Sequence, residues 1–109
     1  MATVDRSAGV IFASDTLDDG QSTDITLEGS DVDAAEVHNI IHGGSCTVTV
    51  LVDSDNTGSF DKTVDVDTFS GSGISQGNSL ELAGDDVALR ITDSSGGTGN
   101  DYVITGVPL

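Results

Sequence analysis

Alternation of apolar and polar residues is the feature that most restricts the fold of this chain. Between residues 46 and 53, valines occupy positions 48, 50 and 52 and alternate with a mainly polar set. Because successive side chains of a strand point to opposite faces, this period of two predicts a β-strand with one apolar face. The pattern recurs at residues 24–28, 62–67, 80–82 and 87–91, and further strand candidates cover residues 10–13 and 102–107.

Clusters of Gly, Asp and Ser separate these segments and indicate turns. Seven or eight short strands divided in this way predict an all-β fold, an antiparallel β-sandwich or jelly-roll-like arrangement, in a single domain over residues 1–109. The clearest hairpin joins residues 46–52 to 60–66. Residues 70–77 are rich in Gly and Ser and are expected to form a mobile loop or a packing site for a neighbouring subunit.

The segment Asp33–His42 is ambiguous. It fits a helix with Ser30 or Asp31 as N-cap and a glycine C-cap, and it fits a turn followed by a strand over residues 36–41. The all-β context favours the strand. The choice decides the meaning of His38 and His42, which would stack one turn apart on a helix but would stand about 13 Å apart on one face of a strand. We expect two exposed or half-buried histidines and no metal pair.

The charge balance restricts the surroundings of the protein. Sixteen Asp and three Glu face only Arg6, Lys62 and Arg90, so the formal net charge is -16. Molar salt shortens the Debye length to about 3 Å and screens this repulsion, so the surface fits a medium saturated in salt. Phosphate would be repelled, which argues against nucleic acid. No apolar stretch is long enough for a membrane span or a signal peptide, so we expect synthesis in the cytoplasm.

The core must be mainly aliphatic, because the chain has no Trp and only four Phe and Tyr residues. Cys46 is the only cysteine, so an internal disulfide is excluded. Its place in a predicted strand indicates a small buried thiol.

The turn from Asp53 to Asp61 resembles the start of an EF-hand calcium loop. Asp53, Asp55 and Thr57 supply oxygen atoms at positions one, three and five, a glycine follows, and Asp61 stands at position nine. The closing acid at position twelve is absent, and turn chemistry accounts for the same residues. We therefore predict no cofactor and no metal site, with the Asp53–Asp61 tip as the candidate if Ca²⁺ or Mg²⁺ binds.

Two pairs of adjacent carboxylates, Asp18-Asp19 and Asp85-Asp86, lie in predicted tight turns. Paired acids serve glycoside hydrolysis, but the chain lacks aromatic platforms for a sugar. No nucleophile stands in a strand-to-helix elbow beside a base. We predict no catalytic residues and no enzymatic activity.

Residues 82–93 and 100–106, and the strand with its acidic, glycine-capped turn over residues 47–61, resemble small β-sandwich virion proteins. With the acidic surface, the chain resembles structural proteins of tailed viruses that infect haloarchaea: capsid decoration or turret subunits, or a tail component. The resemblance rests on strand–turn patterns rather than signature residues. It implies no catalytic residues and implies oligomerisation on a capsid or tail, sometimes with cations at acidic interfaces.

The sequence therefore predicts a non-enzymatic virion structural protein of a halophilic tailed virus, an oligomeric capsid-decorating or turret subunit. Its partners would be other copies of itself and major capsid or tail proteins, with no nucleic acid and no membrane. It would be assembled in the host cytoplasm and located in the virion. Contacts would involve apolar residues on sheet faces and exposed strand edges. The alternative is a ligand- or receptor-binding sandwich for a carbohydrate or host surface, using a cation at Asp53, Asp55 and Asp61.

Overall fold

A computed structural model describes residues 2–6, 9–28, 30–55, 57, 59–75, 80–84 and 86–109. The described residues form strands joined by turns, with no helix. The strands are β1 (Ala2–Thr3), β2 (Ile11–Leu17), β3 (Ser22–Thr26), β4 (Ala34–His42), β5 (Cys46–Val52), β6 (Lys62–Phe69), β7 (Gly73–Ser75), β8 (Leu80–Ala83), β9 (Val87–Asp93) and β10 (Asn100–Pro108).

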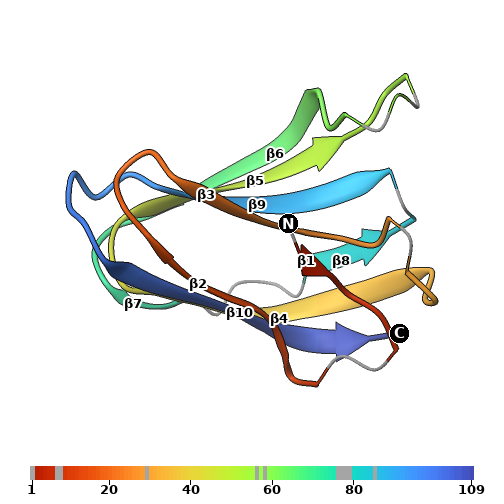
Figure 1. Cartoon of the computed structure of the whole chain (residues 1–109), viewed down its shortest axis with the longest axis horizontal. Helices are drawn as coiled ribbons and strands as arrows, with labels where there is room; N and C mark the ends of the chain where they lie inside the picture. The colour runs from red at the N-terminus through yellow and green to blue at the C-terminus, as the bar shows by residue number, and fades with distance from the viewer. Residues whose placement is uncertain are drawn as a thin grey trace.

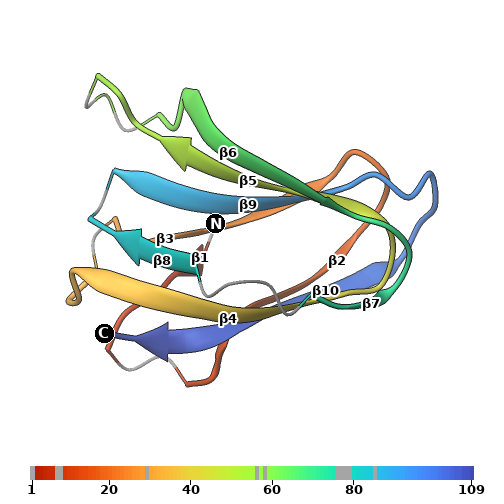
Figure 2. The ribbon, with the colours of Figure 1, turned by 180° about the vertical axis from the view of Figure 1, so that it is seen from behind.

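The strands build two sheets that pack face to face (Figures 1 and 2). Sheet A has the order β1-β3-β9-β5-β6, and sheet B has the order β2-β10-β4-β7, with β8 also paired to β4. All the described pairs are antiparallel except β1 with β3. The predicted β-sandwich is confirmed. Its strands outnumber the expected seven or eight because β1 and β7, of two and three residues, are too short to show alternation.

The predicted hairpin is present, with β5 and β6 paired from Cys46 opposite Phe69 to Val52 opposite Lys62. Figure 1 shows it projecting from the body of the sandwich at the upper right. The ambiguous segment is strand β4, as favoured, and its centre pairs with β10. The predicted loop over residues 70–77 is wrong at Gly73–Ser75, which pair with the edge of β4. That edge offers unpaired backbone groups, so even a glycine-rich segment adds a short strand there. Residues 76 and 77 lie outside the described residues.

The core lies between the sheets and is mainly aliphatic, as expected, with Phe12 and Tyr102 added. Cys46 is fully buried within it. Gly106 shows how tightly one part is packed. A Cβ at this position would collide with the backbone of Glu36 and with the ring of Phe12. Both pairings of β10 change register beside Gly106, so only a residue without a side chain fits between the aromatic ring and the neighbouring strand.

Aspartates cover backbone amides on one edge strand of each sheet. β6 lies at one edge of sheet A and β2 lies at one edge of sheet B. The carboxylates of Asp15, Asp65 and Asp67 each accept a hydrogen bond from the next amide along the chain, at 2.8–2.9 Å. The short Asp side chain reaches its neighbouring amide and so blocks strand addition there.

Among the described residues, no segment forms a helix with the length and apolar character needed to cross a membrane.

Candidate functional site

Two acidic sites lie at opposite ends of strand β5, and the groups that surround their carboxylates differ. Asp53 follows the last residue of β5, whereas Asp93 pairs with the first residue, Cys46. We call the first group, Asp53, Asp55 and Asp61, the acidic tip. We call the second, Asp93 with its hydrogen-bond donors, the buried acid network.

The acidic tip gathers three carboxylates. One oxygen atom from each of Asp53, Asp55 and Asp61 lies within 4.8 Å of the other two. Asp53 is buried, with 8% of its surface exposed, and the other two are exposed. The β5–β6 hairpin brings them together, because Asp61 immediately precedes β6. The structure therefore places the three residues of the predicted cation candidate side by side.

Local donors hold the acidic tip. The amide and the hydroxyl of Ser54 both donate to Asp61 at 3.2 Å. The amide of Thr57 donates to Asp53 at 3.1 Å, and its hydroxyl donates to Asp55 at 2.8 Å. The pKa of Asp61 is lowered, chiefly by the amide of Ser54, while partial desolvation and the charge of Asp53 oppose the shift. These contacts are those of an acid-rich turn.

The acidic tip meets a calcium ion's needs only in part. Ca²⁺ takes six to eight oxygen ligands, and three carboxylates supply a fraction of them. Position twelve of the EF-hand-like sequence is Val64, a residue of β6 that is 57% exposed. Strands rather than helices flank the turn. Gly58, the glycine at position six of the resemblance, lies outside the described residues. Any cation held here would keep several water ligands.

The buried acid network was not foreseen from the sequence. Asp93 is 1% exposed, and its carboxylate accepts four hydrogen bonds. Ser95 donates through its amide at 2.8 Å and its hydroxyl at 2.6 Å. The Asn100 amide group donates at 2.9 Å and the Tyr102 hydroxyl at 2.8 Å. A signal was present in the Asp-x-Ser sequence at the end of a strand, which favours a local side chain-to-backbone turn.

These donors set the charge of the network. Burial alone would raise the pKa of Asp93, but the hydrogen bonds from Ser95, Tyr102 and Asn100 outweigh it and lower the pKa to about 2. Burial and the hydrogen bond to Asp93 raise the pKa of Tyr102. Burial, and then the charge of Asp93, raise the pKa of Cys46 to about 11. Asp93 is therefore ionised and Cys46 is a protonated, unreactive thiol at neutral pH.

The adjacent carboxylates Asp18 and Asp19 also bind backbone. Asp18 accepts from the amide of Gly99 and Asp19 from the amide of Gly96, both at 2.9 Å. They fasten the loop between β9 and β10 onto the turn between β2 and β3. In the other pair, Asp85 lies outside the described residues, and the carbonyl of Asp86 accepts from the amide of Asp53 at 2.8 Å.

The two histidines do not share a face. The pairing of β4 with β10 passes from Asn39 to Val37, so His38 is an extra residue in a bulge and reverses the alternation. His38 is exposed and lies 2.9 Å from Glu36. His42 is buried, against the expectation of an exposed or half-buried ring; it lies 2.7 Å from the carbonyl of Gly71 and stacks on Phe69. The prediction that His38 and His42 share one face of the strand is wrong, because it assumed a regular strand without the bulge at His38.

Comparison with known proteins identifies a viral relative of this chain. No protein-family model matches it. The chain is 42% identical over 90 residues to Gp30 of Haloferax tailed virus 1, an alignment that covers 81% of this chain and 77% of Gp30. The chain belongs to the Gp30 family. This relationship to a gene product of a haloarchaeal tailed virus agrees with the predicted viral family, and it supports a viral protein.

Proposed function

We propose that this member of the Gp30 family is a non-enzymatic structural protein of the virion, an oligomeric capsid-decorating or turret subunit. Its similarity to Gp30 over most of both chains is the observation that carries the proposal. Its partners would be other copies of itself and major capsid or tail proteins. It would enter the particle during assembly in the host cytoplasm.

The use of acidic residues supports a structural role. Asp93 joins four donors inside the sandwich, Asp18 and Asp19 fasten one loop to another, and three edge aspartates cover their own strands. Within the described residues, every buried side-chain N and O atom has a hydrogen-bond partner. A fold whose buried polar side chains all have hydrogen-bond partners suits a structural subunit of a particle.

Exposed apolar side chains also support assembly. On the outer face of sheet B, Val103 pairs with Ile41 and Ile41 pairs with Ile74, which gives an apolar row across three strands. Ile74 is 58% exposed, as is Ile11 on β2 of the same sheet. Exposed apolar groups on so acidic a protein are typical of a surface that an assembly covers.

Analysis of purified virus particles tests the proposal. We expect mass spectrometry of density-purified virions to find this chain in a fixed ratio to the major capsid protein, and immunogold labelling to place it on the particle. Salt washing that removes adsorbed host proteins serves as the control. A chain that is abundant in infected cells and absent from washed particles would contradict the proposed role.

The convergence of three carboxylates at the acidic tip favours a second candidate function, a cation-dependent module that binds a carbohydrate or host surface. It differs from the first in requiring divalent ions. A CaCl₂-dependent rise in melting temperature at constant ionic strength, abolished by Asp55→Ala, would support it. Equal responses of wild type and variant would count against it.

A further inference from the structure

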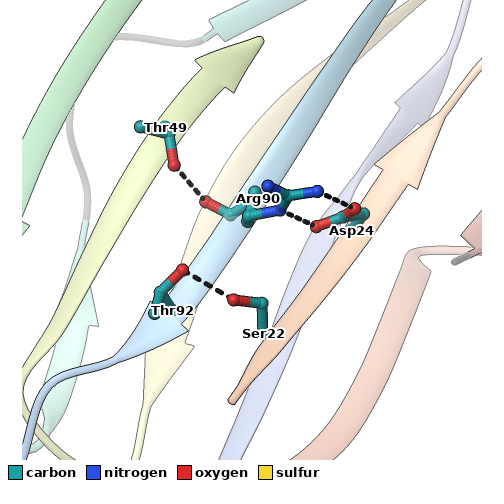
Figure 3. A network of polar contacts seen from close by, with 5 residues as sticks. All are labelled: Ser22, Asp24, Thr49, Arg90 and Thr92. Carbon is teal, nitrogen blue, oxygen red and sulfur yellow. Dashed lines mark hydrogen bonds and ion pairs between the residues drawn. The ribbon is translucent and has the colours of Figure 1, made fainter. Parts of the chain in front are cut away.

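The outer face of sheet A is covered by regular rows of small side chains. Antiparallel pairing aligns Ser22, Thr92, Thr47 and Thr68, from four neighbouring strands, in a row of hydroxyl groups. The next row holds Asp24, Arg90, Thr49 and Val66. Figure 3 shows five of these residues, with Ser22 bonded to Thr92 at 2.8 Å.

These two rows carry no net charge. Asp24 and Arg90 are their only charged residues, and they form a two-bond ion pair, with 2.7 Å from Nε to Oδ1 and 2.9 Å from the terminal nitrogen to Oδ2 (Figure 3). On β6, Asp65 and Asp67 stand opposite Val50 and Val48, so they point toward the core side of sheet A instead. The chain has a net charge of -16 and only three basic residues, and one of these, Arg90, neutralises the acid on this face.

Most side chains of the two rows are also stiff. Thr and Val are β-branched, so their side chains hold few rotamers and lose little entropy when a partner covers them. Val66 is 56% exposed and adds apolar area beside the hydroxyl row. The edge strands β2 and β6 are less suitable for pairing, because Asp15, Asp65 and Asp67 already cover amides there.

We propose that the outer face of sheet A docks onto the same face of a second copy of this chain, around a two-fold axis. Charge complementarity identifies this occupant. When the axis lies in the interface and crosses the Asp24–Arg90 line at right angles near its centre, each carboxylate faces a guanidinium of the other copy. We propose this orientation because opposite charges then meet. Elsewhere the excess negative charge of each copy would repel the other.

The size of the face sets the expected strength. Four strands of 5, 7, 7 and 8 residues, about 4.8 Å apart and at about 3.4 Å per residue, give a contact of roughly 450 Å² per copy. The two copies together would bury about 900 Å², which is below the range of stable complexes and within that of transient ones, so the dimer is weak. This inference rests on the proposed structural role only for the expectation that copies associate.

Sedimentation equilibrium of the purified chain in about 3 M KCl, up to about 1 mM protein, tests the inference. We expect a monomer–dimer equilibrium in the wild type. Thr47→Glu would bury an unpaired charge in the hydroxyl row and weaken the dimer by at least about tenfold, even in high salt, because desolvation of the charge is not screened. Thr68→Glu, in the same row on the exposed edge strand, is the second variant if the first lowers the melting temperature.

Thr105→Glu is the matched control. Thr105 is a half-buried threonine on the outer side of β10 in sheet B, near the apolar row. It should leave the dimer unchanged. A strict monomer at every concentration, a dimer weakened by Thr105→Glu but not by Thr47→Glu, or an oligomer that neither substitution weakens would overturn the inference. None of these results would decide whether the chain is in the virion, which mass spectrometry of particles measures separately.

Discussion

The buried acid network and the acidic tip use the same side chain for opposite purposes. Asp93 is buried and surrounded by four donors, so its charge is stabilised by the protein. At the acidic tip, three carboxylates converge beside the donors Ser54 and Thr57, so like charges face one another. An aspartate in this protein is therefore a structural element or a solvated charge according to the donors around it.

Replacing an aspartate with asparagine in each region tests this contrast, and the larger effect is expected at Asp93. Asp93→Asn removes the charge and replaces one carboxylate oxygen with an NH₂ group that faces two of the four donors, so we expect a loss of about 2–4 kcal/mol in the free energy of unfolding. Thermal denaturation in about 3 M KCl would show a melting temperature lower by about 10 °C or more. A variant as stable as the wild type would remove the distinction between the two regions.

The pH dependence of this loss is the next largest effect. The pKa of Asp93 is about 2 in the folded protein against 3.8 ordinarily. A lowered folded pKa gives stability that is present above about pH 4 and is lost as pH falls toward 2. We therefore expect the gap in stability between wild type and Asp93→Asn to narrow over this range. High salt screens the general repulsion among carboxylates, so the change in that repulsion over this pH range is small. A gap independent of pH would show that the charge of Asp93 contributes nothing.

Tyr102→Phe probes one donor of the network and keeps the ring in the core. Losing the hydrogen bond to a charged acceptor should lower the unfolding free energy by about 1.5 kcal/mol. The remaining donors from Ser95 and Asn100 keep Asp93 ionised at neutral pH. Urea denaturation measures the loss. If Tyr102→Phe cost as much as Asp93→Asn, the tyrosine rather than the set of donors would hold the network.

The smallest effect is expected at the acidic tip. Asp55→Asn removes one of three converging charges, so it should change stability by less than about 0.5 kcal/mol, upward in low salt and by nearly nothing in high salt. Under the proposed structural role, wild type and variant should respond equally to CaCl₂ in the melting experiment. A calcium response confined to the wild type would favour the second candidate function instead.

Much of the fold was predictable because the alternation of apolar and polar residues that marks a strand lies within a few consecutive residues. The segment 46–52 was predicted with the bounds of β5, and the β5–β6 hairpin followed from its alternation and turn residues. The acidic tip was predictable for the same reason, since Asp53, Asp55 and Asp61 lie within one turn. β7 was missed because Gly73–Ser75 carry no alternation, and its pairing depends on the free edge of β4.

The buried acid network and the uncharged face depend on contacts between distant segments. Asp24 and Arg90 are brought together only by the pairing of β3 with β9. The bulge at His38 reverses the faces of β4 without any sign in the local pattern. Sequence periodicity describes one strand at a time, so it cannot show which strands become neighbours.

The sequence by itself determined that the chain is strongly acidic and all-β, because composition sets the net charge and the period of two sets the direction of the side chains. The tertiary structure decided which aspartates are buried, which edges are covered and which face is neutral. Those properties depend on the register between strands, since register selects the donor or opposing charge that each carboxylate meets.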